Sequence, residues 1–161
     1  MVITPEVISL LLPYRPPMLL VDRVLHWESQ SNIMVEKRVD GEDPTILNHL
    51  IGGPRLMPGA MMIEMVGQAA LLLEQLSKYD ASPNLISPSP PVGPILFKVL
   101  ARCKAKFIRP VYAGDTLIAD VHRIGAAVGG TLHSGRLLVR QDLVAEVEVM
   151  ALDFVHRSGE S

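Results

Sequence analysis

Residues 59–76 are the most constraining feature of the sequence, because they form a helix-prone segment that is apolar on nearly every side. The segment contains no proline and no β-branched run, and Pro58 precedes it, a residue favoured at helix starts. A helix without a polar stripe must be surrounded by protein. Its length of about 27 Å would match the width of a small sheet. We therefore expect a central buried helix, with apolar positions Ala60, Met61, Met62, Ile63, Met65, Val66, Ala69, Ala70, Leu71, Leu72 and Leu73.

The rest of the chain predicts mainly β-structure. Period-two alternation of apolar residues from Phe97 to Phe107 predicts a strand with one buried face. One buried helix among five or six mostly antiparallel strands is an α+β architecture, here expected as a single domain over 1–161. We expect a short helix at 4–11, loops at 41–58 and 77–94 (the second Pro/Ser-rich and flexible), a hairpin turn at Gly129–Gly130, and further strands at 18–28, 32–40, 116–124, 132–140 and 143–154.

Composition excludes several classes of function. The net charge of −2 argues against a nucleic-acid-binding protein. The lone Cys103 removes disulfides and paired-thiolate zinc sites, and no histidine has a partner at ligand spacing, so we expect no metal. Glu64, Gln68 and Glu74 interrupt the most apolar stretch, and the N-terminal residues make a poor signal peptide, so we expect a cytoplasmic protein without a membrane span. The hydrophobic share of 48% predicts that some apolar surface meets a partner chain.

Two polar side chains interrupt the apolar half of the predicted helix. Glu64 and Gln68 are four residues apart and therefore share one face. A carboxyl group in apolar surroundings resists ionisation and is suited to act as a general acid. The alternative is that Glu64 points into solvent through a gap in the sheet.

Two features before and at the helix start complete a possible site. His49 lies in the loop that leads to the helix, where an imidazole can serve as a general base, although loop histidines are more often plain surface residues. Gly59 follows Met57 and Pro58, and its unobstructed amide at a helix N-terminus is suited to hold a negative oxygen; the alternative is an ordinary helix start. Together these groups suit elimination of water from a 3-hydroxyacyl thioester, a reaction that needs no cofactor.

The motifs LLPYRPPMLLVDRV, MPGAMMIEMVGQAA, KFIRPVYAGDTL and VAEVEVMALDF, with His49 between the first two, resemble bacterial 3-hydroxyacyl-[acyl-carrier-protein] dehydratases. The similarity runs from about Leu12 to Phe154. It implies a hot-dog fold and a dimer with two sites at its interface, each using His from one subunit and Glu from the other. It also implies that His49 is the base, Glu64 the acid, Gly59 the oxyanion amide and Gln68 the residue that orients the acid.

The chain departs from the family pattern in three places. Tyr14 stands where the family usually has His, Asn48–Gly52 replaces a Gly-His-Phe-Pro-Gly loop, and His49 and Glu64 are one residue further apart than usual. Dehydration of carrier-linked 3-hydroxyacyl chains in fatty-acid or polyketide-type synthesis is the expected function. Two alternatives stay open: a hot-dog thioesterase that activates water with the same groups, and a non-catalytic subunit that pairs with an active homologue.

Several basic residues lie along the strand predicted over residues 97–107 and just after it. The resemblance implies that they dock an acidic acyl carrier protein bearing a phosphopantetheine-linked acyl chain, mainly by raising the association rate. The alternative is a merely solvated strand face. The expected partners are thus this carrier and a second copy of the chain, or a homologue in a heterodimer. The basic residues concerned are Lys98, Arg102, Lys104, Lys106 and Arg109.

Overall fold

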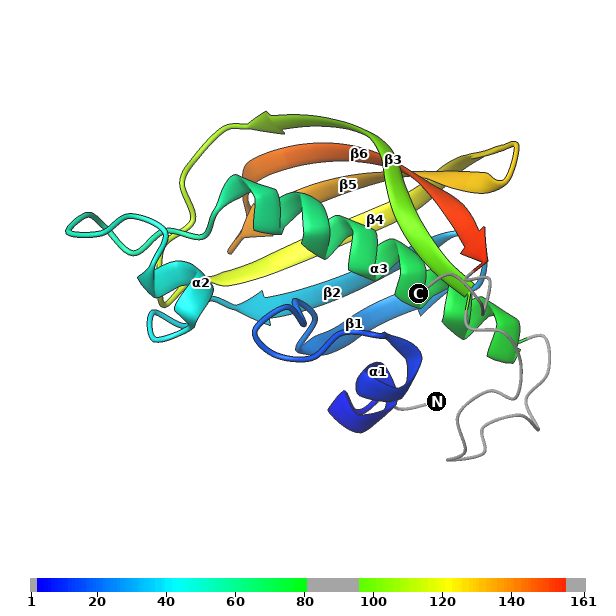
Figure 1. Ribbon diagram of the computed structural model, residues 1–161, viewed down its shortest axis with the longest axis horizontal. Helices are drawn as coiled ribbons and strands as arrows, with labels where there is room; N and C mark the ends of the chain where they lie inside the picture. Colours follow the sequence, from blue (N-terminus) through cyan, green and yellow to red (C-terminus); the bar gives the residue numbers. More distant parts are fainter. Residues whose placement is uncertain (1–2, 81–95, 156–161) are drawn as a thin grey trace, which may run out of the picture.

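The computed structural model describes residues 3–80 and 96–155 of the chain, and Figure 1 shows how their elements are arranged. One long helix lies along one face of a sheet, and a short N-terminal helix lies on the side of the sheet formed by its first strands. In chain order the elements are α1 (Pro5–Leu11), β1 (Arg23–Glu28), β2 (Asn32–Arg38), α2 (Pro44–Leu47), α3 (Gly59–Asp80), β3 (Leu96–Phe107), β4 (Thr116–Ala127), β5 (Gly130–Val139) and β6 (Asp142–Val155).

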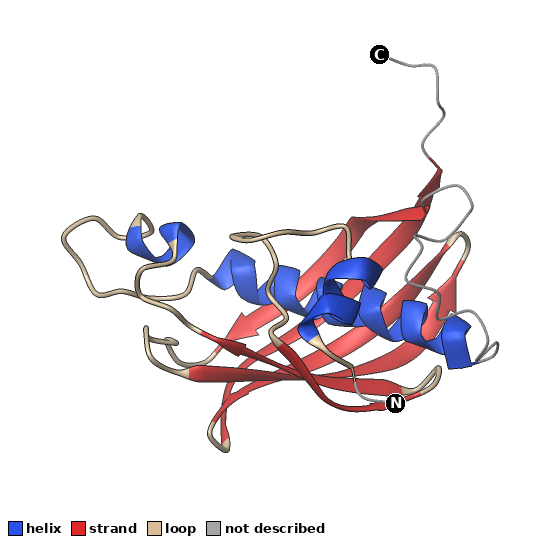
Figure 2. Cartoon of the chain, turned by 90° about the horizontal axis from the view of Figure 1, so that it is seen from below, coloured by secondary structure: helices blue, strands red, loops and turns tan. Residues whose placement is uncertain are grey.

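The sheet has six strands in the order β1-β2-β4-β5-β6-β3, and every neighbouring pair is antiparallel. Seen from below in Figure 2, the sheet curves and α3 lies along its inner face. The expected architecture of one long helix against an antiparallel sheet is therefore confirmed.

The core lies between α3 and this inner face. Met65, Val66, Ala69 and Leu72 of the helix are fully buried, which confirms that the apolar segment is surrounded by protein. Alternate residues of the central strands meet them, in cross-strand rows such as Val35, Ala119, Leu137 and Ala145. Burial of this apolar area is the main force that holds the helix on the sheet.

Gly135 of β5 is a point of close approach between helix and sheet. A Cβ atom built on this glycine would lie 2.7 Å from Cγ2 of Val66, well inside van der Waals contact. The absence of a side chain at 135 therefore allows the second turn of α3 to pack directly onto the β5 backbone.

Several boundaries differ from those expected. The helix extends through residues 77–80, which were expected to begin a loop, while the remainder of that loop lies outside the described residues. The loop 41–58 contains the short helix α2, because Asp43 caps it and Pro44 fits its first position. Residues 18–22 precede β1 instead of belonging to it. In the part of the chain described here, no helix is long and apolar enough to cross a membrane.

Strand β3 differs most from its expected pattern. It is an edge strand, and a β-bulge interrupts its pairing with β6 between Leu100 and Arg102. Because a bulge adds one residue to one strand, it reverses which side chains face inward. Lys98 and Leu100 therefore line the pocket between β3 and α3, with Leu100 still 55% exposed. Val99, expected on the buried face, is 46% exposed and is not among the residues that line this pocket.

Candidate active site

A pocket opens between α3 and the half of the sheet formed by β5, β6 and β3. Its apolar wall includes Leu71 of α3 and Val149 of β6, and Gly67 leaves space on the helix side. Glu64 and Tyr14 also line the pocket. The carboxyl group predicted to act as an acid therefore faces a largely apolar pocket, and its residue is neither fully buried nor fully exposed.

Gln68 holds this carboxyl group in place. The Gln68 Nε2 atom donates a hydrogen bond to Oε1 of Glu64 at 2.9 Å and a second to the Met18 carbonyl oxygen at 2.7 Å. Its Oε1 atom accepts a hydrogen bond from the Leu20 backbone N–H at 2.8 Å. Since Gln68 is fully buried and its amide group is tied at both ends, the orientation of Glu64 is fixed by the segment that precedes β1.

Tyr14 is a second neighbour of Glu64, and its contact was not predicted from the sequence. Burial raises the pKa of the Tyr14 hydroxyl, and the charge of Glu64 together with a hydrogen bond to that carboxyl raises this pKa further. The hydroxyl therefore stays protonated and is available as a donor to Glu64. The only signal in the sequence was that Tyr14 occupies a family histidine position within the motif before β1.

His49 lies in the loop between α2 and α3, and its side chain is exposed. Its Nδ1 atom is 3.1 Å from the carbonyl oxygen of Leu56. Because a carbonyl only accepts hydrogen bonds, Nδ1 carries the proton in the neutral ring, and Nε2 keeps a lone pair that is able to accept one. Leu56 itself is anchored by a β-bridge to Tyr112, so the carbonyl that orients the imidazole is fixed.

Gly59 is the first residue of α3, and the ring of Phe107 lies against it. A Cβ atom built at this position would be 2.9 Å from Cζ of Phe107. Only glycine therefore permits this contact between the helix start and the end of β3 without a shift. The Gly59 amide belongs to the first helical turn, whose N–H groups have no partner within the helix.

The structure thus brings together some of the predicted residues and separates others. Glu64 and Gln68 are in direct contact at the pocket. Among the residues that the structure describes, those lining this pocket include neither His49 nor Gly59. One copy of the chain therefore presents the carboxyl and the imidazole at separate places.

The five basic residues are also divided. Arg102, Lys104 and Lys106 are exposed on β3, and Arg109 pairs with Asp142 at 3.1 Å. Lys98 points into the pocket instead, where only 12% of its side chain is exposed. In the antiparallel register, Lys104 and Lys106 lie opposite Glu148 and Glu146 of β6, respectively.

A long helix that carries a polar pair into a pocket beneath a curved antiparallel sheet defines a hot-dog-fold protein, as the motifs predicted. Solved structures share this fold: the chain resembles one from the dehydratase heterocomplex ApeI:P of Xenorhabdus doucetiae, with a TM-score of 0.71 and 14% identity over 91% of this chain and 90% of that one.

The sequence relationships are more specific. A family model described as a FabA-like domain matches residues 12–148, and the chain belongs to this family. It is 36% identical to the 3-hydroxyacyl-[acyl-carrier-protein] dehydratase FabZ of Polaromonas naphthalenivorans (strain CJ2), over 87% of this chain and 90% of the relative. It is 33% identical to the FabZ of Anaeromyxobacter sp. (strain Fw109-5), over 91% of this chain and 87% of the relative. The resemblance read from the motifs is confirmed.

Proposed function

We propose that the protein dehydrates 3-hydroxyacyl thioesters on an acyl carrier protein to 2-enoyl thioesters, as a hydro-lyase of fatty-acid or polyketide-type synthesis. The observation that carries the proposal is Glu64, held by Gln68 at an apolar pocket in a chain whose relatives are named as dehydratases of this class. A carboxyl oriented in this way is suited to protonate a leaving hydroxyl group.

The reaction follows from the roles of four groups. Nε2 of His49 takes the proton from C2, and the electrons of that C–H bond move toward the thioester carbonyl. The Gly59 amide stabilises the resulting negative oxygen. Glu64 then protonates the hydroxyl on C3, the C3–O bond breaks, water leaves and the C2–C3 double bond forms. The His49 proton returns to Glu64 through solvent, and no cofactor takes part.

We infer that the imidazole and the carboxyl meet across a dimer interface. Strand β3 lies at the edge of the sheet, and its unpaired backbone groups are a template for pairing with another strand. Val99, Leu100 and Phe107 are exposed along it, which is apolar surface that a second copy of the chain would cover. A homologous chain is the alternative partner, as the heterocomplex of the structural neighbour exemplifies for that protein.

The carrier protein is proposed to dock beside the pocket on the exposed basic residues Arg102, Lys104, Lys106 and Arg109. The glutamates opposite them on β6 reduce the net positive charge of this face. Docking would therefore depend on individual ion pairs with the carrier more than on a strong positive electrostatic potential. Rim charges of this kind mainly affect the association rate.

Mass analysis of the products tests the proposed reaction. The protein is incubated with a 3-hydroxyacyl-carrier substrate, and the mass of the intact acyl-carrier thioester is measured before and after the reaction. Loss of water with the thioester intact supports the proposal. Release of free acid would instead identify a thioesterase, and no turnover without a co-purifying homologue would identify a non-catalytic subunit.

A further inference from the structure

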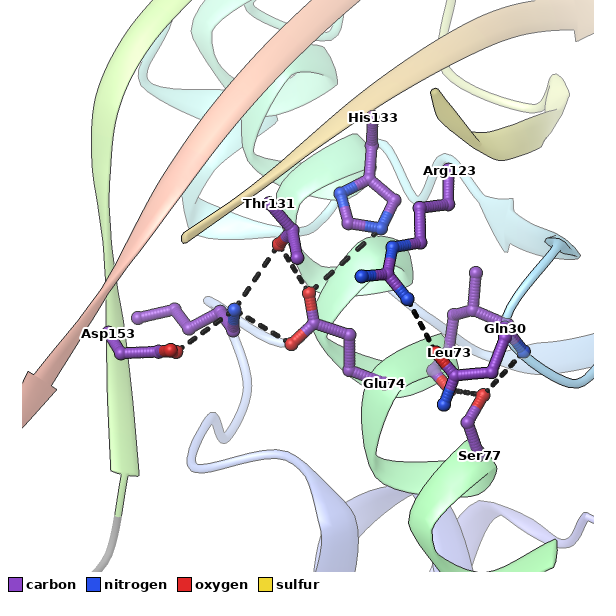
Figure 3. A network of polar contacts seen from close by, with 9 residues as sticks. Gln30, Leu73, Glu74, Ser77, Arg123, Thr131, His133 and Asp153 are labelled. Carbon is purple, nitrogen blue, oxygen red and sulfur yellow. Dashed lines mark hydrogen bonds and ion pairs between the residues drawn. The ribbon is translucent and has the colours of Figure 1, made fainter. Parts of the chain in front are cut away.

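The pocket that begins at Glu64 ends at a second polar group, shown in Figure 3. Glu74 follows Glu64 by ten residues on α3, a distance of about 15 Å along the helix axis. It lines the same pocket as Lys98, Thr131 and His133. The path between the two carboxyl groups is bounded by small and apolar residues, so the far end of the pocket is polar while its middle is not.

The charged members of this second group satisfy one another. Lys98 Nζ lies 2.7 Å from Glu74 Oε2 and 3.0 Å from Asp153 Oδ1. It also donates to Thr131 Oγ1 at 3.2 Å. Thr131 Oγ1 in turn donates to Glu74 Oε1 at 2.5 Å, as the dashed lines in Figure 3 indicate. Lys98 therefore lies between two carboxylates, and Arg123 adds a second positive charge that acts on His133 (Figure 3).

His133 is different, because it is buried without any hydrogen-bond partner. The residue is 1% exposed, and in the described part of the chain neither Nδ1 nor Nε2 has a partner. Its Nε2 is 4.0 Å from Glu74 Oε1, which is beyond hydrogen-bonding distance. Leaving such a group unpaired in the interior costs about 1–3 kcal/mol. A ligand that supplies the missing hydrogen-bond partner would recover this free energy.

The protonation state of His133 narrows the chemistry of that ligand. Burial lowers the pKa of the imidazole to about 4, although the charge of Glu74 acts in the opposite direction. The ring is therefore neutral at neutral pH, with one nitrogen that donates and one that accepts a hydrogen bond. A hydroxyl group suits whichever ring nitrogen faces the pocket, because it can donate to the one that accepts or accept from the one that donates. It also carries no charge, and the nearby carboxylates of Glu74 and Asp153 are already offset by Lys98 and Arg123.

We propose that the far end of this pocket binds a neutral hydroxyl group at the distal end of the acyl chain, with His133 as its direct partner. The inference rests on the proposed function in that Glu64 marks the reacting end of the same pocket. It adds a substrate preference: acyl groups that end in a hydroxyl bind in preference to those that end in a methyl.

Binding of unreactive analogues tests the proposal. Pairs of saturated pantetheine thioesters of equal length, one ending in a methyl and one in a hydroxyl, are titrated into the full-length protein by calorimetry over a series of chain lengths. Chains long enough to reach His133 should bind about fivefold more tightly with the hydroxyl, the worth of one buried hydrogen bond. Shorter pairs should show no preference.

Variants identify the residue responsible. His133→Leu should abolish or reverse the preference, whereas His133→Gln, which keeps a donor and an acceptor, should retain part of it. His26→Leu is the matched control, because His26 is exposed on β1 away from the pocket. Equal binding of both analogues by the parent, or an undiminished preference in His133→Leu, would overturn the proposal.

Dehydration of an unsubstituted 3-hydroxyacyl-carrier substrate is measured on the same proteins. Turnover without a hydroxyl preference refutes this inference alone. A hydroxyl preference without turnover supports this inference and refutes the proposed reaction. If neither analogue binds, the pocket is not an acyl site and the inference fails.

Discussion

Replacing Gln68 by leucine tests whether this residue both stabilises the fold and orients Glu64. Leucine has nearly the size of glutamine, so the change removes hydrogen bonds without opening a large cavity. The buried N–H of Leu20 loses its acceptor at 2.8 Å. The Met18 carbonyl loses its donor, but Met18 is exposed and water can replace it. We therefore expect a loss of about 1–3 kcal/mol in the free energy of unfolding, mainly from Leu20.

The same change should lower activity through Glu64, whose Oε1 loses the donor at 2.9 Å. We expect kcat to fall at least about tenfold while KM changes little, because the carboxyl acts in the transition state more than in binding. Urea unfolding followed by circular dichroism measures the first effect, and steady-state dehydration the second. Gln75→Leu is the matched control, since the described part of the chain shows no side-chain hydrogen bond for this half-buried glutamine of α3. A Gln68→Leu protein with the stability and kcat of the parent would refute the reasoning.

Three further changes test other parts of the structure. Gly135→Ala places a methyl group against Val66 and should cost about 1–3 kcal/mol in urea unfolding, whereas Gly67→Ala, where a Cβ meets nothing within 4 Å, should not. The pKa of His133 is lowered from 6.5 to about 4, so between these pH values the unfolded chain binds more protons than the folded one. The free energy of unfolding should therefore fall by up to about 3 kcal/mol as the pH drops from 6.5 to 4. Unfolding titrations of His133→Leu should show a smaller fall over the same pH range. Tyr14→Phe removes the hydroxyl donor beside Glu64 and should lower kcat about tenfold with an unchanged thermal midpoint; an unchanged kcat would show that Tyr14 only packs there.

The features that the sequence predicted are those set by local pattern. An apolar run without a polar stripe has one physical solution, so the burial of Met65, Val66 and Leu72 followed from it directly. The spacing of Glu64 and Gln68 on one helical face predicted their contact, because that contact lies within a single element.

The features that the sequence did not predict depend on pairing between distant segments. The bulge in β3 arises from its register with β6, and it turned Lys98 from the expected exposed face into the pocket. Alternation along β5 places His133 on the same inner face as Gly135, but its lack of a partner becomes visible only when α3 is packed against it. Tyr14 likewise contacts Glu64 although the two residues are fifty positions apart in the chain, so local pattern could not predict the contact.

The central claim is that His49 of one subunit and Glu64 of another form one dehydration site. His49→Ala and Glu64→Gln should each abolish turnover while leaving the fold intact. In a mixed dimer, however, one of the two sites contains both unchanged residues.

Co-expression of the two inactive variants under different tags measures this directly. Random pairing makes about half of the dimers mixed, each with one working site, so the pooled protein should recover about a quarter of the parent's dehydration rate. A mixed dimer, isolated by both tags, that stays as inactive as either variant alone would contradict the account.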